Sequence, residues 1–479
     1  MLFNSIDFAI FLPVVFLLYW FATRGSLRIQ NILLLVASYF FYASWDYRFL
    51  FLLIFSTFLD YFTGIKIYEA GTRKRKKAWM WLSICINLGF LGVFKYFNFF
   101  AGSFADGLRL LGFHADFWTL QVILPVGISF YTFHGLSYVL DLYNDRISPE
   151  RDYINYAVFV SFFPLLVAGP IERATHLLPQ IIKKREFDYS AAVDGMQQIL
   201  WGLFKKVVVA DNCAPIVAQV FNNPSDHSGS ELLVGVILFA FQIYGDFSGY
   251  SDIAIGTARL FGITLLRNFA FPYFARDIAE FWRRWHISLT TWFRDYLYIP
   301  IGGSRGGKWM AVRNTSIVFL VSGFWHGANW TFIAWGLLNA LFFLPLLVLD
   351  RNRRNIEIAA RGKLFPEWKD IAGMMATFCL TLLAWVFFRS QSITASLSFI
   401  RDIFDPSLFT RPTLKTGIIW VFIMMLLFFE WMFREKQHGL QLNGTRMHVS
   451  LKWALVMALG LVIFIFGNFN KTEFIYFAF

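Results

Sequence analysis

His326 is the residue of this chain that most strongly suggests chemistry, because its surroundings are apolar. Residues 322–330 read SGFWHGANW, and apolar sequence continues beyond them. An ionisable side chain at membrane depth is by default a candidate functional residue. An imidazole that titrates near neutral pH can serve as a general base or acid. A helix-packing hydrogen bond is the other interpretation, and the residues alone leave both open for His326.

A second histidine, His286, stands forty residues earlier in a segment that is both aromatic and basic. Residues 279–300 read AEFWRRWHISLTTWFRDYLYIP. This composition is typical of helices that lie in the cytoplasmic interface of a membrane, and we expect such helices within residues 267–313. His286 either shares a polar cavity with His326 or is an interfacial histidine on a lipid-facing helix. Residue type alone favours the interfacial histidine.

Two aspartates lie in another apolar run. Residues 242–252 read QIYGDFSGYSD, and they contain Asp246 and Asp252. Carboxylates in such a run are costly unless they are paired. They either line a polar tunnel and orient a histidine, or they belong to a buried network with Arg259 or a neighbouring helix, which we favour. We expect Lys205 and Lys206 to mark the cytoplasmic end of a span by snorkelling.

The composition is that of a membrane protein with many spans. The chain of 479 residues is 57% hydrophobic and only 15% charged, against about 25% charged in a soluble domain. Its apolar runs predict an all-α polytopic protein of about ten to twelve transmembrane helices, with re-entrant and interfacial helices, in one membrane domain over residues 1–479. The net charge of +12 falls in short loops, which indicates the positive-inside rule and not nucleic-acid binding. The three cysteines stand far apart and predict no metal site.

The basic loops predict an orientation, and two apolar runs predict interruptions. Basic residues follow the first run and gather at 73–77, so we expect the N-terminus outside and these residues in the cytoplasm. The run 315–349 is too long for one span and is basic on both flanks. It therefore predicts a helical hairpin or a broken helix, with the break near His326 and Gly327. Pro164 and Gly169-Pro170 predict a re-entrant segment within residues 154–171.

These motifs together resemble the membrane-bound O-acyltransferase family, and the resemblance extends over nearly the whole chain. It lies within the bacterial branch that includes the alginate O-acetyltransferase membrane subunit and the D-alanyl transfer protein of teichoic acids. No single motif would suffice. The residues that carry it are Arg283-Arg284-Trp285-His286 with Trp292, Tyr296 and Tyr298, then Trp325-His326-Gly327, and, in family order, residues 125–131, 168–171 and 246–252.

The resemblance implies a ring of tilted helices around a central tunnel. The family's invariant histidine falls on His326, and its second polar position falls on His286. Many bacterial relatives carry another histidine shortly after the invariant one, and this chain departs from them with Asn339. The remaining candidates for lining the tunnel or binding the donor are Arg283, Arg284, Trp285, Asp246, Asp252, Tyr296, Trp325, Asn329 and Asn339.

The resemblance also implies a reaction in the bacterial inner membrane. An acyl group, in the first place acetyl, would pass from a cytoplasmic thioester to a hydroxyl of an extracytoplasmic polysaccharide or to a partner transferase. The donor substrate would be acetyl-CoA or an acyl-carrier protein, with no bound cofactor. His326 would take the hydroxyl proton, and His286 would orient the thioester or stabilise the oxyanion. The alternatives are D-alanyl transfer from a carrier protein to a cell-wall polymer, and a transporter or proton pathway without enzymatic activity.

Overall fold

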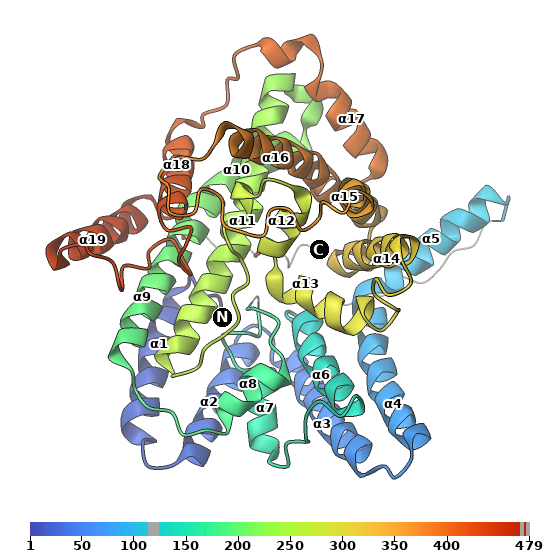
Figure 1. The fold of residues 1–479 in the computed structure, drawn as a ribbon, viewed down its shortest axis with the longest axis vertical. Helices are drawn as coiled ribbons and strands as arrows, with labels where there is room; N and C mark the ends of the chain where they lie inside the picture. The colour runs from blue at the N-terminus through green and yellow to red at the C-terminus, as the bar shows by residue number, and fades with distance from the viewer. Residues whose placement is uncertain (114–123, 168, 470–473, 476–479) are drawn as a thin grey trace. The chain divides into compact units, whose positions relative to one another are not determined.

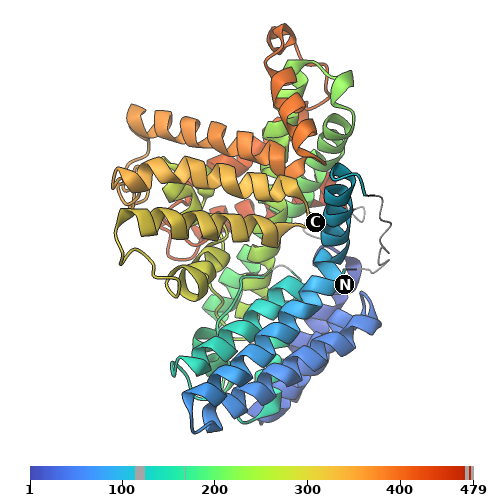
Figure 2. The same cartoon turned by 90° about the vertical axis from the view of Figure 1, so that its right-hand side faces the viewer.

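The computed structural model describes residues 1–113, 124–167, 169–469 and 474–475. Within these residues all regular structure is helical, which confirms the predicted all-α class (Figures 1 and 2). The sequence also predicts an apolar span at residues 119–140 and a loop outside the membrane at residues 99–118. The first part of that span, the end of that loop and Ala168 of the motif at 168–171 lie outside the described residues.

Six helical segments in the described residues are long and apolar enough to cross a membrane. They are α3 (Tyr47–Glu69), α4 with its continuation through α5 (Arg73–Leu110), α11 (Gly229–Leu260), α15 (Trp330–Val348), α16 (Trp368–Arg389) and α19 (Val449–Phe466). Three shorter apolar segments are Ile6–Ala22, Leu27–Ala43 and Gly417–Met432. The protein therefore has several membrane spans. The predicted number of ten to twelve transmembrane helices stays a prediction, because six helical segments of the described residues are long and apolar enough to span a membrane.

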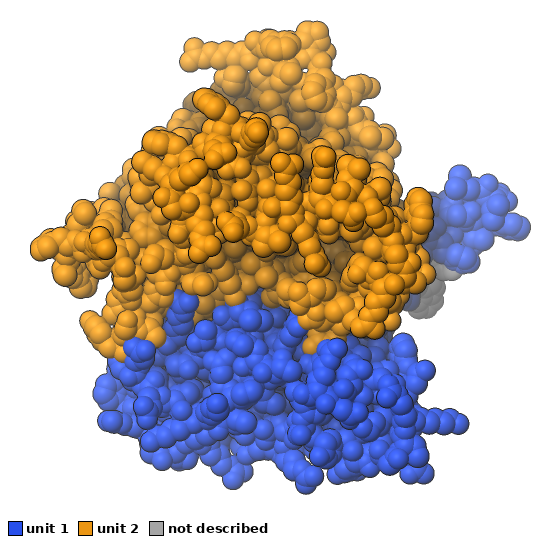
Figure 3. Space-filling view, in the orientation of Figure 1, with its two compact units in different colours: residues 1–188, 258–266 blue, residues 189–257, 267–479 orange. Residues whose placement is uncertain are grey.

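The contacts divide the chain into two compact units, which Figure 3 colours separately. Unit 1 comprises residues 1–188 and 258–266, and unit 2 comprises residues 189–257 and 267–479. The single membrane domain over residues 1–479 stays a prediction.

Unit 1 is built around helices that approach one another closely at small residues. In it α3 packs against α4 (Arg73–Leu91) and α6 (Ile128–Tyr143), and α2 (Leu27–Ala43) packs against α7 (Tyr153–Ser161). The buried Asp60 of α3 accepts hydrogen bonds from Ser83 Oγ at 2.6 Å and Asn87 Nδ2 at 2.8 Å. A Cβ on Gly135 would lie 1.9 Å from Asp60 Oδ2, so only glycine lets α6 pass this carboxylate. The unit thus satisfies a buried carboxylate with hydrogen bonds.

The predicted interruption within 154–171 is present in unit 1. Helix α7 ends at Ser161, ahead of Pro164, and α8 begins at Ala174 and ends at Ile181. Residues 162–167 and 169–173, which lie between them, form no regular helix. Gly127, at the start of α6, has φ 75°, and a Cβ there would lie 2.0 Å from Leu166 O. Both backbone conformation and space therefore require glycine at that position. Whether this segment re-enters a membrane stays a prediction.

Unit 2 contains three helices that lie side by side, α14 (Lys308–His326), α15 and α16 (Figure 2). The short helices α12 (Ile278–Arg284) and α13 (Ile287–Phe293) precede them, and α12 contacts α15. Helix α9 (Tyr189–Leu203), a π-helical segment over Phe204–Ala210, α10 (Asp211–Asn222), α11, α17 (Ile393–Ile403), α18 (Gly417–Met432) and α19 complete the unit.

The lysines of the π-helical segment are buried, so the prediction that they snorkel at a span end is wrong. Lys205 and Lys206 are 2% and 1% exposed. Lys205 Nζ lies 2.5 Å from Asp252 Oδ2, and Lys206 Nζ lies 2.7 Å from Asp246 Oδ1 and 2.8 Å from Asp211 Oδ1. Each buried charge is therefore compensated by an opposite one. The two aspartates belong to a buried network with a neighbouring helical segment, as we favoured.

A close approach of α9 to α11 brings these charges together. A Cβ on Gly249 would lie 2.7 Å from Gly202 O, and a Cβ on Gly202 would lie 2.6 Å from Gly249 O. The two glycines thus let the backbones nearly touch, which side chains of any size would prevent. The pairing between the lysines and the aspartates depends on this contact and not on any local sequence signal.

Candidate active site

His326 is the last residue of α14, and the break that follows it lies where the apolar run at 315–349 predicts one. Helix α15 begins at Trp330, so residues 327–329 join two helices of a hairpin. Asn329 caps α15, because its Oδ1 accepts a hydrogen bond from Thr331 N at 3.0 Å. The predicted hairpin is therefore present, and its turn places the histidine at the end of a helix.

Glycines let the two helices of this hairpin pack backbone to backbone. A Cβ on Gly323 would lie 2.3 Å from Phe332 O, and a Cβ on Gly336 would lie 2.5 Å from Phe319 O. Gly327 has an extended backbone that any residue can adopt, with φ −161°. A Cβ there would nevertheless lie 2.1 Å from Cε2 of the Phe332 ring. The glycine beside His326 is thus required for space and not for conformation.

His286 joins α12 to α13 in a left-handed backbone conformation, with φ 44° and ψ 53°. Its side chain is 1% exposed, so the interpretation as a lipid-facing interfacial histidine is wrong. The neighbouring Trp285 is also 1% exposed and stacks on Phe281 at a centroid distance of 5.5 Å. The aromatic residues of this segment pack inward within unit 2. The placement of α12 and α13 in a membrane interface stays a prediction.

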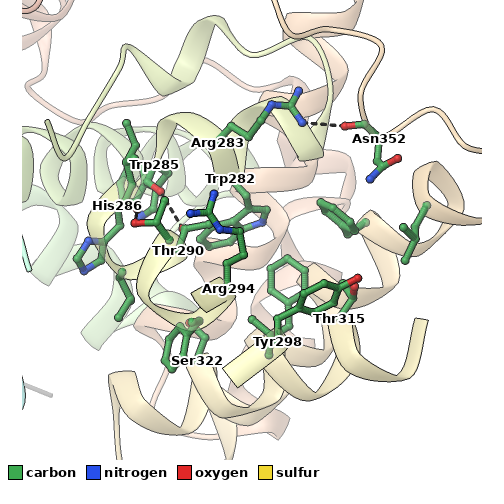
Figure 4. A pocket seen from close by; sticks show the side chains of 18 of the residues that line it. Trp282, Arg283, Trp285, His286, Thr290, Arg294, Tyr298, Thr315, Ser322 and Asn352 are labelled. Carbon is green, nitrogen blue, oxygen red and sulfur yellow. Dashed lines mark hydrogen bonds between the residues drawn. The ribbon is translucent and has the colours of Figure 1, made fainter. Parts of the chain in front are cut away.

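A cavity of about 490 Å³ within unit 2 is lined by both histidines. This volume lies in the range typical of small-molecule sites, roughly 300 to 1,000 Å³. Figure 4 shows side chains that surround the cavity, with Trp282, Arg283, Arg294 and Tyr298 among them. Its lining is mostly apolar with a few polar groups, which suits a ligand that carries both kinds of surface.

Arginines supply the positive charge of the cavity. Arg283 donates hydrogen bonds to the carbonyl oxygens of Asn352 at 2.7 Å and Asn355 at 2.8 Å, and Figure 4 shows the first of these. Arg294 Nε lies 2.7 Å from Asp295 Oδ1, and Arg353 also lines the cavity. Guanidinium groups are suited to bind phosphate, because they offer paired N–H donors in one plane.

Aromatic rings surround the imidazole of His326, which is 3% exposed. Its centroid lies 5.1 Å from the ring of Trp335 and 5.5 Å from that of Phe388. The ring of Trp325 lies 4.9 Å from that of His326 and 6.1 Å from that of His286. Trp325 therefore neighbours both histidines.

The imidazole of His286 has one partnered nitrogen. Its Nδ1 lies 3.0 Å from Asn268 Oδ1, whereas Nε2 has no hydrogen-bond partner among the described residues. Burial lowers the pKa of His286 to about 3, because desolvation disfavours the imidazolium. The side chain is therefore neutral at physiological pH.

The structure brings only some of the sequence candidates to the cavity. His326, His286, Arg283 and Trp285 line it. The others have local contacts. Arg284 forms an ion pair with Glu280 at 2.5 Å, and Asp246 and Asp252 form ion pairs with lysines. Asn339 Nδ2 donates a hydrogen bond to Trp335 O at 2.8 Å and Asn329 caps α15, while Tyr296 packs on Trp292 at a centroid distance of 5.0 Å and Trp325 neighbours both histidines. No group of three or more His, Cys, Asp or Glu side chains in the described part of the chain could hold a metal ion.

Sequence reasoning missed several residues of the site. Ser322 lines the cavity four residues before His326 on the same helix, a spacing that places both on one face and could have revealed it. Arg353 lies in the basic residues that follow the apolar run at 315–349, which we interpreted only as a cytoplasmic flank of that run. Asn268 lies in an irregular segment, and no local pattern indicates its contact with His286.

The comparisons with known proteins identify the family of the chain. A sequence model of the membrane-bound O-acyltransferase family matches residues 128–386. A Pseudomonas syringae protein named "Probable alginate O-acetylase" is 39% identical over 82% of this chain and 73% of its own length. A "Peptidoglycan O-acetyltransferase" of Helicobacter pylori is 34% identical over 100% of this chain and 98% of its own length. A "Teichoic acid D-alanyltransferase" of Streptococcus thermophilus is 28% identical over 56% and 69%.

The chain belongs to the membrane-bound O-acyltransferase family. It is a membrane enzyme with several spans that transfers acyl groups to oxygen. The resemblance seen in the sequence is thereby confirmed, including its similarity to the alginate-type proteins.

Proposed function

We propose that this enzyme transfers acetyl from a cytoplasmic thioester to a hydroxyl group of an extracytoplasmic polysaccharide, or to a partner transferase that completes the step. The observation that carries the proposal is one cavity in unit 2 that two buried histidines and three arginines line. The names of the two similar acetylating relatives, which refer to alginate and to peptidoglycan, support acetyl as the acyl group and a polysaccharide as the acceptor.

His326 is the proposed general base. The acceptor oxygen bonds to the acyl carbon of the thioester, and the carbon–sulfur bond then breaks. The hydroxyl proton passes to His326, and from there to the departing thiolate, so that the imidazole is regenerated. The position of His326 supports this role, because its imidazole is buried among aromatic rings and the residue lines the cavity.

Arg283, Arg294 and Arg353 are the proposed donor-binding residues. Acetyl-CoA carries several phosphate groups, and the prosthetic arm of an acyl-carrier protein carries one, so a guanidinium-lined cavity suits both. We propose acetyl-CoA as the donor. The basic loops would lie in the cytoplasm of a bacterial inner membrane, with the N-terminus outside.

A D-alanyl transferase is the second candidate, because the teichoic acid relative also aligns with this chain. Both candidates would use the same two histidines, and they differ in the acyl group, in its donor and in the acceptor polymer. The transporter alternative is set aside by membership of an enzyme family.

The test measures transfer from labelled acetyl-CoA by the purified protein in lipid nanodiscs. Alginate oligosaccharides, peptidoglycan fragments and teichoic acid serve as acceptors, and D-alanyl carrier protein serves as the alternative donor. We expect acetylation of one polysaccharide by the wild type and none by His326→Ala. His448→Ala, outside the cavity, is the matched control. Full transfer by His326→Ala at an unchanged protein level would refute the assignment of the base.

A further inference from the structure

Asn268 contacts His286 through both its side chain and its backbone. It lies in the irregular segment between α11 and α12 and is 0% exposed. Its carbonyl oxygen accepts a hydrogen bond from Ile287 N at 2.9 Å, at the residue that follows His286. This hydrogen bond therefore fixes the backbone directly after His286. The left-handed conformation of His286 costs energy, because residues other than glycine rarely adopt it.

The orientation of the Asn268 amide follows from its neighbours. A backbone N–H can only donate, and Ser288 N lies 3.4 Å from the Oδ1 atom of Asn268. Ser288 Oγ donates to the same oxygen at 2.8 Å. On the other side, Asn268 Nδ2 donates to Ser251 Oγ at 3.0 Å. These contacts set Oδ1, and not Nδ2, toward His286.

This orientation determines which nitrogen of His286 carries the proton. Asn268 Oδ1 can only accept, so Nδ1 of His286, at 3.0 Å, must be the donor. In a neutral imidazole the other nitrogen then holds a lone pair. Nε2 is buried and has no hydrogen-bond partner among the described residues, and His286 is one of the residues that line the cavity. A histidine in this tautomer accepts hydrogen bonds at Nε2 and cannot donate one to an oxyanion there.

We propose that Asn268 is a positioning residue that fixes His286 in the Nδ1–H tautomer, so that Nε2 accepts a hydrogen bond from an N–H or O–H group of a substrate in the cavity. The inference rests on the proposed acyl transfer and refines it. Of the two roles expected for His286, substrate orientation fits this tautomer and oxyanion stabilisation does not. The donor group belongs either to an amide of the pantetheine arm or to a hydroxyl of the acceptor.

The rings that contact His286 carry no charge, since they belong to Phe247, Phe269 and Trp325. The charged or titratable side chains that line the same cavity are Arg283, Arg294, Tyr298, His326 and Arg353. The only cause of the lowered pKa of His286 is burial. No carboxylate is among the described residues that line the cavity or whose rings contact His286, so a carboxylate at residue 268 would introduce a negative charge next to this imidazole.

Two substitutions separate positioning from mere packing. Asn268→Ala removes the acceptor at Nδ1, so both tautomers become possible, and we expect kcat to fall about tenfold, the factor that corresponds to loss of one hydrogen bond of about 1.4 kcal/mol. Asn268→Asp keeps an acceptor at Nδ1 and adds a charge that raises the pKa of His286. It should therefore retain more activity than Asn268→Ala at about pH 8 and lose it toward about pH 5, where the wild type loses less.

Three further measurements make the test decisive. The ¹⁵N signals of His286, assigned with His286→Gln, should show the Nδ1–H tautomer in the wild type and in Asn268→Asp but a mixture in Asn268→Ala. Asn268→Ala should have no added effect on kcat in the His286→Gln background. The KM for acetyl-CoA should rise if the pantetheine arm is the hydrogen-bond donor, and the KM for the acceptor should rise if the hydroxyl is. Asn314→Ala, a buried asparagine outside the cavity, is the control and should leave the pH profile unchanged.

The proposal is overturned if the ¹⁵N signals of Asn268→Ala match those of the wild type, or if Asn268→Asp and Asn268→Ala have the same pH profile. The tautomer measurement needs no turnover. A wild-type enzyme that acetylates no acceptor would thus refute the proposed function while still leaving the role of Asn268 open to a direct answer from the spectra.

Discussion

Gly323→Ala in α14 should displace His326 without touching the histidine itself. The added Cβ would lie 2.3 Å from Phe332 O and 3.1 Å from Phe332 C, both of them backbone atoms of the partner helix. Ordinary contact between such atoms needs about 3.5 Å, so the two backbones must separate by about 1 Å. Neither atom belongs to a flexible side chain that could move aside, and His326 lies only one helical turn from Gly323.

The expected magnitude has two parts. Overpacking of a tight contact destabilises by about 1–3 kcal/mol, and a displacement of about 1 Å at a reacting group can lower the rate about a hundredfold. We therefore expect Gly323→Ala to lower kcat far more than it lowers the apparent Tm. The assay is acetyl transfer in nanodiscs at matched protein amounts, with thermal unfolding followed in parallel.

Gly460→Ala in α19 is the matched control, since a Cβ there meets nothing within 4 Å. This substitution should keep full activity and stabilise the helix by up to about 1 kcal/mol, because alanine has the higher helix propensity. A kcat of Gly323→Ala within about twofold of the wild type, which is a barrier change of less than 0.5 kcal/mol, would show that the hairpin contact does not position His326.

Gly327 permits a second test of the same reasoning, because an added Cβ at this position would collide with a side chain and not with backbone. A Cβ on Gly327 would meet the ring of Phe332, with Cε2 at 2.1 Å and Cδ2 at 2.3 Å. Gly327→Ala should therefore be harmful alone but nearly neutral when added to Phe332→Ala. Gly323→Ala should stay harmful in that background, because its obstacle is the backbone of residue 332. If Phe332→Ala restored the activity of Gly323→Ala as fully as that of Gly327→Ala, the distinction between a backbone contact and a side-chain contact would be contradicted.

Three further predictions concern charge. Lys206→Met leaves Asp246 and Asp211 without their buried cation and should destabilise the protein by about 3–5 kcal/mol, seen as a lower apparent Tm, whereas the exposed Lys184→Met should not. Burial lowers the pKa of His286 to about 3, so below about pH 6.5 the unfolded chain binds a proton that the native protein does not bind. The free energy of unfolding should therefore fall by up to about 1.4 kcal/mol per pH unit between about pH 6.5 and pH 3. His286→Gln should show a smaller loss of Tm on acidification, and an equal loss would contradict the neutral imidazole. Arg283→Gln should raise the KM for acetyl-CoA, more clearly at low salt, and an unchanged KM would exclude Arg283 from donor binding.

The break in the histidine-bearing hairpin could be predicted from the sequence, because its causes are local. The apolar run at 315–349 is longer than a bilayer requires and basic at both ends, so it has to turn. Asn329 and Gly327 then define where α14 ends and α15 begins. The motif around His286 was likewise recognisable, and both histidines line one cavity.

The environment of His286 and of the two lysines could not be predicted in this way. Residue types favoured a lipid-facing histidine and snorkelling lysines, and burial reversed both interpretations. Lys205 and Lys206 find their carboxylates because Gly202 and Gly249 let two helices nearly touch. That contact joins residues that are distant in the sequence, so the periodicity of apolar residues along the chain cannot predict it.

The amino-acid sequence by itself determined the all-helical membrane class, the acyltransferase family and the residue at the end of α14 that is proposed to do the chemistry. Those properties depend on hydropathy, loop charge and short motifs, which are read along the chain. Only the tertiary structure decided that Asn268 meets His286 and which imidazole nitrogen is left with a lone pair. A tautomer depends on which atom lies three ångströms away, and only the folded chain brings those atoms together.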